Sequence, residues 1–151
     1  MTANAPWNRC APVDASIPYG RMRMMLYHVA PELTVASAML PSGLDGCYCE
    51  ETQTILIDRR LTYTAKRCVL VHELMHWRHG DAGCGPLNGK AERRARRETA
   101  LALVSPVEYA LAEQLYDGEP EPIAQELDVT RQVIEDYRLM LHDGILLESA
   151  G

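Results

Sequence analysis

The chain has 151 residues, 47% of them hydrophobic, and its 21 acidic and 15 basic side chains leave a net charge of −6. This size fits one domain, or one domain with a small appendage. The acidic balance disfavours general binding to nucleic acid or to a membrane surface. We expect no membrane span, because no apolar run reaches the required length. Residues 1–10 have neither a basic start nor an apolar stretch, so we expect no signal peptide and a cytoplasmic protein.

The cysteines predict reduced thiols rather than a disulfide framework. Their number is odd and their spacing matches no framework: Cys10, Cys47, Cys49, Cys68 and Cys84. Thiols of this kind are typical of a cytosolic protein. Cys68 stands in a strongly apolar stretch, where we expect it to act as a small buried hydrophobe.

The N-terminal half predicts a small sheet. Residues 1–18 contain three prolines and little periodicity, which indicates a loose arm, and Tyr19–Val29 has the spacing of a short helix. Leu33–Leu40 reads as a strand. Cys47–Glu50 and Thr54–Asp58 are short strands separated by three residues, so a hairpin is expected.

The C-terminal half predicts helices. One helix begins near Lys90 and ends before Pro106, and a second runs from Pro106 to about Tyr116. Gly118–Pro122 has the composition of a linker. Two short helices, Ile123–Leu127 and Thr130–Leu141, follow and resemble a helix-turn-helix. We expect residues 1–116 to form the main domain and residues 117–151 a small helical segment packed on it or linked to it.

The most informative stretch is His72-Glu73-Leu74-Met75-His76, an H-E-x-x-H motif. An α-helix turns through 3.6 residues, so side chains four apart lie one above the other. His72 and His76 can therefore bind one ion through two imidazole nitrogens. Glu73 lies about 100° round the helix and can reach a water on that ion without being a ligand. This is the arrangement of a catalytic zinc site with an open position.

The surroundings of the motif favour this interpretation over a chance spacing. Thr62 or Thr64 can cap the helix, and most residues between Cys68 and Met75 are apolar. Two histidines and a glutamate on a buried helix need partners, and a metal ion would satisfy all three.

A third protein ligand is needed, and Glu92 is the preferred candidate. Small and apolar residues share its helical face: Ala95, Thr99, Ala102 and Leu103. That face can pack on the motif helix and direct Glu92 at the ion. Glu98 points elsewhere, among Arg94 and Arg97, where surface ion pairs are expected. Asp81, better suited to anchoring a loop, and Cys84, a thiolate just beyond the helix, are also possible ligands.

These residues resemble the ImmA/IrrE family of metallo-endopeptidases, in particular the short forms found in actinobacterial phages and mobile elements. The similarity covers about residues 40–104 and includes the H-E-x-x-H motif, Gly80-Asp81 and a run from Glu92 to Ala100. The resemblance implies a zincin-like α+β fold and assigns the third ligand to Glu92. The chain departs from the family pattern at Arg96 and Glu98.

The resemblance also implies a function. We expect a zinc endopeptidase of narrow specificity, with Glu73 as the catalytic base, and with a transcriptional repressor or related regulator as substrate in a phage or mobile-element switch. Tyr48, Tyr63 and Tyr109 are candidate oxyanion donors of equal standing. The alternative is a non-proteolytic module that keeps the zinc fold and acts by binding a regulator.

Two charged regions remain. The basic side chains between Lys90 and Arg97 form either a solvated helix face or a contact for an acidic partner or DNA. Residues 119–148 are strongly acidic, so we expect the helix-turn-helix-like segment to pack or to recognise protein, and direct DNA binding to be disfavoured.

Overall fold

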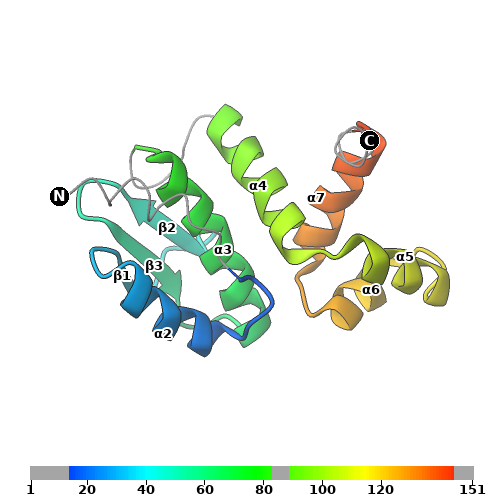
Figure 1. Ribbon diagram of the computed structural model, residues 1–151, viewed down its shortest axis with the longest axis horizontal. Coiled ribbons are helices and arrows are strands. Elements are labelled where there is room, and N and C mark those ends of the chain that lie inside the picture. The colour runs from blue at the N-terminus through cyan, green and yellow to red at the C-terminus, as the bar shows by residue number, and fades with distance from the viewer. Residues whose placement is uncertain (1–13, 83–88, 145–151) are drawn as a thin grey trace.

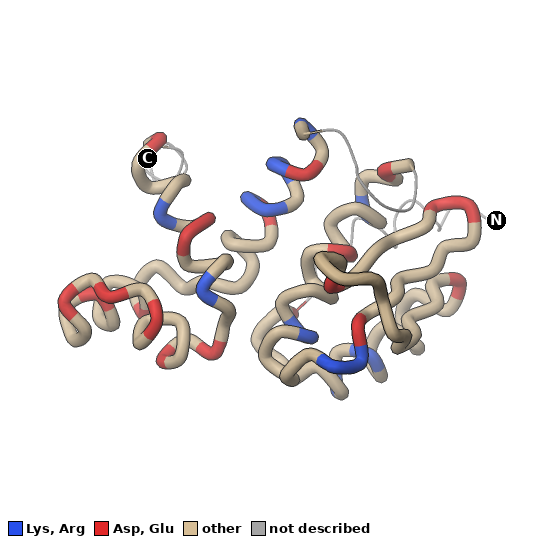
Figure 2. The backbone as a smooth tube through the Cα atoms, turned by 180° about the vertical axis from the view of Figure 1, so that it is seen from behind, with Lys and Arg blue, Asp and Glu red and all other residues tan. Residues whose placement is uncertain are grey.

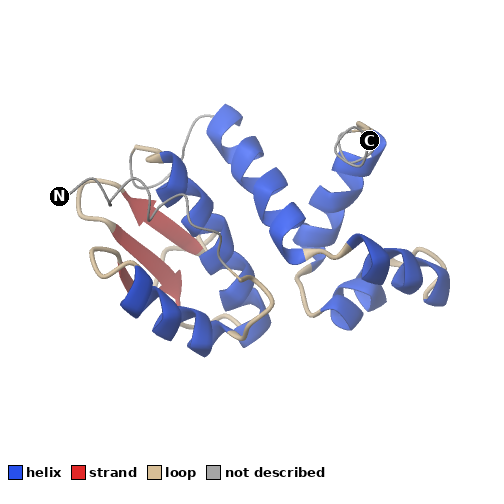
Figure 3. Cartoon of the chain, viewed as in Figure 1, coloured by secondary structure: helices blue, strands red, loops and turns tan. Residues whose placement is uncertain are grey.

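The computed structural model describes residues 14–82 and 89–144, and within these ranges it contains three strands and six helices (Figure 1). In chain order the elements are α2 (Tyr19–Val29), β1 (Thr34–Ala38), β2 (Gly46–Cys49), β3 (Thr54–Asp58), α3 (Tyr63–His79), α4 (Gly89–Leu103), α5 (Pro106–Leu115), α6 (Pro120–Leu127) and α7 (Arg131–His142). The expected α+β class is confirmed. Figure 3 shows the strands grouped at one end of the molecule and α4–α7 at the other. The arm and tail predictions for residues 1–13 and 145–151 lie outside the described residues.

The sheet has β3 at its centre. β1 pairs with β3 in parallel and β2 pairs with it antiparallel, so the predicted hairpin is confirmed. Ile55 and Ile57 of β3 are fully buried and belong to one core cluster with Leu70 and Leu74 of α3. Because β-strand side chains alternate, this isoleucine face fixes α3 against the sheet.

Both ends of α3 are set by local signals. The Thr62 side chain accepts a hydrogen bond from the backbone N–H of Ala65 and caps the first turn. At the other end Gly80 adopts the left-handed conformation, with φ 63°, which glycine reaches without a steric penalty. Of the two expected caps, Thr62 is the correct one, since the Thr64 hydroxyl instead donates to Asp128.

The C-terminal helices form a second core. It gathers apolar side chains from α4 to α7 around Ile123, Ile134 and Tyr137, and includes Cys68 of α3, which is buried as expected. Arg67 is also buried and donates to the backbone carbonyls of Ala15 and Asp128, which ties α3 to segments at both ends of the chain. α3 therefore takes part in both cores.

The predicted linker at Gly118–Pro122 is wrong in part, because Pro120 opens α6. Proline lacks only an N–H that the first helical turn does not use, so it fits there well. The junction of α6 and α7 is where it was expected, with Asp128 in the left-handed conformation and Thr130 capping α7. None of the helices in the described ranges has the length and apolarity needed to cross a membrane.

Gly46 marks a close contact between β2 and α3, which gives a stability prediction. A Cβ atom there would lie 2.5 Å from Val69 Cγ1 and 3.1 Å from the Leu56 carbonyl oxygen. Because valine is stiff and the carbonyl belongs to the sheet, Gly46→Ala should lower the free energy of unfolding by about 1–3 kcal/mol, as measured by urea denaturation. Gly20→Ala is the matched control, since nothing lies within 4 Å of its Cβ position. Equal unfolding midpoints for Gly46→Ala and wild type would contradict the prediction.

Candidate metal centre

The H-E-x-x-H motif lies in the second half of α3. His72 and His76 are one helical turn apart, and their ring centroids are separated by 5.0 Å with an interplanar angle of 78°. The His76 side chain is 2% exposed and that of His72 is 19% exposed. The two imidazoles therefore occupy the same side of the helix, as their spacing predicted.

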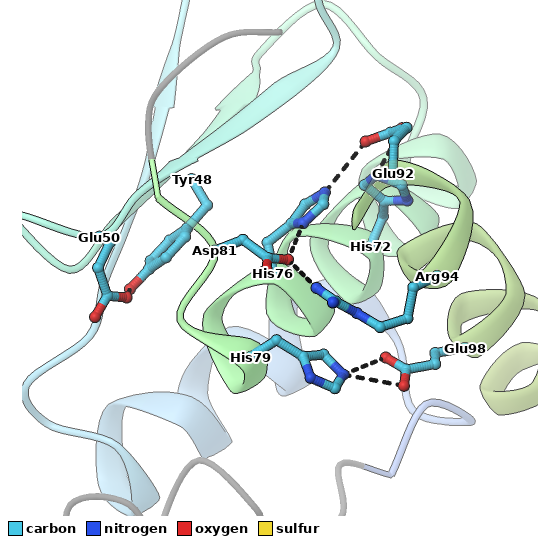
Figure 4. Close-up of polar contacts among 9 residues, drawn as sticks. All are labelled: Tyr48, Glu50, His72, His76, His79, Asp81, Glu92, Arg94 and Glu98. Carbon is cyan, nitrogen blue, oxygen red and sulfur yellow. Dashed lines mark hydrogen bonds and ion pairs between the residues drawn. The ribbon is translucent and has the colours of Figure 1, made fainter. Parts of the chain in front are cut away.

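Glu92 meets both imidazoles from the first turn of α4. His72 Nε2 lies 3.2 Å from Glu92 Oε2, and His76 Nε2 lies 3.2 Å from Glu92 Oε1 (Figure 4). One potential ligand atom from each of the three residues lies within 4.8 Å of the other two. With metal–ligand distances near 2.0–2.1 Å, neighbouring ligands of a tetrahedral zinc ion stand about 3.3 Å apart. The nitrogen-to-oxygen separations thus suit one small cation.

The charges of this group also suit a cation. Hydrogen bonding to His72 and then to His76 holds the pKa of the Glu92 carboxyl well below its usual range. Burial by itself would lower the pKa of His76, but its contacts with Glu92 and Asp81 outweigh burial and raise it. Two imidazole nitrogens facing one ionised carboxylate form a donor set of the nitrogen-and-oxygen type that zinc binds.

Glu73 stands beside the group rather than in it. Its side chain is buried, and it lines a cleft next to His72. Burial raises the pKa of Glu73, while the nearby His72 and His76 oppose that shift. The structure therefore places a carboxyl group of raised pKa, which can accept and release a proton, at the edge of the donor set.

Asp81 occupies a position that the spacing of the motif does not predict. Its Oδ2 lies 2.7 Å from His76 Nδ1, on the opposite ring nitrogen from the one that faces Glu92. Arg94 of α4 donates to the same Asp81 oxygen (Figure 4). A carboxylate on Nδ1 fixes the tautomer that leaves Nε2 free to bind an ion. The sequence signal was Gly80, whose left-handed turn brings the next residue back beside His76.

Glu98, the second carboxylate of α4, lies away from the donor set. It contacts His79 Nε2 at 2.9 and 3.0 Å, and both side chains are partly exposed. Glu98 therefore forms a surface ion pair as expected, but with a histidine instead of an arginine. Cys84 lies outside the described residues.

A cleft of about 270 Å³ opens beside the donor set. Its walls come from residues 43–46, which lead into β2, from α3 and α4, and from α7, which contributes Gln132, Val133 and Asp136. A larger cavity of about 930 Å³ between α2, β1 and the start of α3 is lined by Tyr63 but by none of the predicted metal ligands and not by Glu73. The candidate residues His72, Glu73 and Glu92 therefore line the smaller of these two cavities, and α7 borders it.

The tyrosines expected as oxyanion donors do not line this cleft. Tyr48 and Tyr109 each donate a hydrogen bond to a nearby glutamate, and Tyr63 is exposed at the first turn of α3. The residues described as lining the cleft include Arg96 and Gln132 as hydrogen-bond donors. The expectation fails because spacing along the chain does not reveal which side chains α4 and α7 bring to the site.

The comparisons with known proteins give one match. The family model Peptidase_M78, described as the IrrE N-terminal-like domain, matches residues 32–140. Comparisons with curated proteins and with solved structures find no match.

The matched residues run from just before β1 into α7 and include the H-E-x-x-H motif, Asp81 and Glu92. They cover well over half of the chain. The resemblance noted from the sequence is therefore confirmed at the level of the family, and the chain belongs to the Peptidase_M78 metallopeptidase family, with an IrrE N-terminal-like domain.

Proposed function

We propose that this protein is a zinc-dependent endopeptidase of narrow specificity that cleaves a transcriptional repressor or a related regulator. The observation that supports it is the group of His72, His76 and Glu92, which lies beside a cleft lined by His72, Glu73 and Glu92. The regulator as substrate, and its place in a phage or mobile-element switch, rest on the sequence resemblance.

Each residue has a distinct part in the proposed reaction. His72 Nε2, His76 Nε2 and a Glu92 oxygen would hold zinc, which supplies a Lewis acid for the scissile carbonyl and lowers the pKa of a water towards ~7. Asp81 keeps the His76 ring oriented through Nδ1. α7 closes one side of the cleft and limits how a peptide can enter.

Glu73 moves the proton. Its carboxylate accepts a proton from the attacking water and delivers it to the leaving amine nitrogen. The pKa of a proton-transfer group works best near the operating pH, and burial shifts the pKa of Glu73 in that direction. The adjacent Gly46 leaves room for a carboxylate that stays close to the sheet edge.

The organisation of the chain fits a protein substrate. We propose that residues 1–116 carry the catalytic machinery and that the small helical segment 117–151 helps to bound the cleft. We place the protein in the cytoplasm, acting on protein and not on DNA. Figure 2 shows many acidic positions along the backbone of the C-terminal helices, and their charge would repel phosphate.

Zinc content tests the donor set. Purified protein should bind about one zinc per chain, and His72→Ala, His76→Ala or Glu92→Ala should weaken binding by more than about 100-fold. Free zinc at about 100 times its Kd should stabilise the wild type by about 2.7 kcal/mol, because the metal binds the native state. Metal analysis after dialysis and thermal denaturation with added zinc measure both effects. Glu98→Ala is the matched control, and full zinc retention by Glu92→Ala would move the third ligand elsewhere.

Removing the Asp81 carboxylate tests its orienting role. Asp81→Ala should lower zinc affinity about 10- to 100-fold, because the His76 ring loses the acceptor that fixes its tautomer. Asp81→Asn keeps a hydrogen-bond acceptor without the charge and should lose less. Competition with a coloured zinc chelator measures the affinities. The role is refuted by a folded Asp81→Ala protein that binds zinc as tightly as the wild type.

Glu73→Gln separates the peptidase from a non-proteolytic binding module. The variant should keep zinc and lose about 10²- to 10⁴-fold in cleavage rate, because the amide cannot accept the proton. Cleavage is read by mass spectrometry as new N-termini in a lysate of cells that carry the gene, and casein should stay intact. If the protein were instead a non-proteolytic binding module, the wild type would produce no new N-termini. Its effect on the bound regulator would then persist in Glu73→Gln.

A further inference from the structure

A further, smaller cavity of about 160 Å³ lies between α4 and α7. We call it the arginine groove, and its walls include Arg93, Arg96 and Arg97 of α4 and, across from them, Asp136, Leu139 and the adjacent Asp143. The peptidase mechanism uses none of these side chains.

The arginine groove adjoins the catalytic cleft. Arg96 and Asp136 line both cavities, one from each helix. Arg96 Nε also lies 3.5 Å from Glu92 Oε2, so this boundary begins at the donor set itself. A chain that occupies the cleft and extends between α4 and α7 therefore passes Arg96 and Asp136 and enters the groove.

Arg94 of α4 differs from Arg93 and Arg97 in the contacts that it makes. Arg94 turns towards α3 and donates to Asp81, so it belongs to the site. Arg93 and Arg97 are exposed, stand one turn apart, and form no ion pair with any described residue. Like charges four apart on a helix oppose each other slightly, and a carboxylate between them would relieve this. Figure 2 shows several basic positions along the backbone of α4.

The opposite wall supplies an apolar contact. Leu139 is 63% exposed, whereas Ile134 and Met140 on the same helix, α7, are buried. Asp136 accepts a hydrogen bond from Gln132 at 3.0 Å, and Asp143 follows the end of the helix. Three guanidinium groups therefore face two carboxylates, and the groove keeps a net positive charge beside one exposed leucine.

We propose that the arginine groove binds the part of the protein substrate that continues beyond the scissile bond, and that it selects a segment with one apolar side chain next to carboxylates. The apolar side chain packs on Leu139, and the carboxylates pair with Arg93 and Arg97. This assignment rests on the proposed peptidase function and adds the substrate feature that makes it selective. A cavity of this volume, bordered by acidic α7, does not admit duplex DNA.

Peptide binding tests the proposal without cleavage. The probes are fluorescein-labelled peptides with a randomised centre, flanked at both ends by leucine and by glutamate or aspartate. A second pool replaces the acids with glutamine and asparagine. Fluorescence anisotropy on the full-length, zinc-loaded Glu73→Gln protein should show about 2- to 30-fold tighter binding of the acidic pool, as two exposed ion pairs supply. Equal binding of both pools, or of neither, overturns the proposal.

Variants locate the preference. Arg93→Glu combined with Arg97→Glu should remove the preference for acidic peptides, and Arg93→Gln with Arg97→Gln should reduce it, with zinc content unchanged. Arg21→Glu with Arg59→Glu makes the same change in net charge at exposed arginines away from the groove and should leave the preference intact. If both charge-reversed proteins lost the preference for acidic peptides, the net charge of the protein would explain the preference and the groove proposal would fail. If the protein with Arg93→Glu and Arg97→Glu lost binding to duplex DNA while its peptide binding stayed unchanged, the groove would be assigned to nucleic acid and the proposal would be refuted.

Cleavage assays then distinguish the peptidase proposal from the groove proposal. Sites cut by the wild type in the lysate should carry acidic residues several positions from the cut, and the charge-reversed groove variant should lose this enrichment while still cleaving. If no site is cut but the acidic peptides still prefer the intact groove, the peptidase function fails and the groove stands as a binding site. If cutting occurs without acidic enrichment and without binding preference, the peptidase stands and the groove proposal fails.

Discussion

The packing of α4 against α3 is the constraint on which the site depends. Ala91, Ala95 and Thr99 are buried on the inner face of α4, and their small side chains let the two helix backbones approach closely. That approach brings the Glu92 carboxylate within 3.2 Å of both imidazoles. A slide of α4 by one residue would displace Glu92 by about 1.5 Å along the axis and turn it away. The geometry of the candidate metal centre therefore depends on this one helix–helix contact.

The same helix acts on both nitrogens of His76. Glu92 faces Nε2, and Arg94, two residues later, holds the Asp81 carboxylate that faces Nδ1. A histidine between two carboxylates has a defined tautomer and ring orientation. α4 thus contributes one candidate ligand, Glu92, and also holds the carboxylate that orients another, His76 of α3. The contact with Asp81 explains why a basic side chain, Arg94, lies beside the helix that carries the H-E-x-x-H motif.

The C-terminal helices take part in the site although the motif lies far from them in sequence. They share a core with α4 and with Cys68 of α3, and α7 carries Asp136 to the cleft. The arginine groove between α4 and α7 and the candidate metal centre on α3 and α4 therefore share the helix α4. Arg94 pairs with Asp81 beside His76, whereas Arg93 and Arg97 line the arginine groove and not the cleft.

Local physics explains what the sequence determined by itself. The helical period put His72 and His76 on one side of α3, and a threonine cap predicted the start of that helix, because these features depend on neighbours a few positions away. Glu92 was an intermediate case, since the small residues on its face predicted packing but not the partner. Only the tertiary structure placed Asp81 behind His76 and brought α7 to the cleft. It also separated Arg94 from Arg93 and Arg97, and it directed the expected tyrosines away from the site. These arrangements arise from contacts between distant segments, and such contacts are decided by how whole faces of helices pack, which periodicity along the chain does not encode.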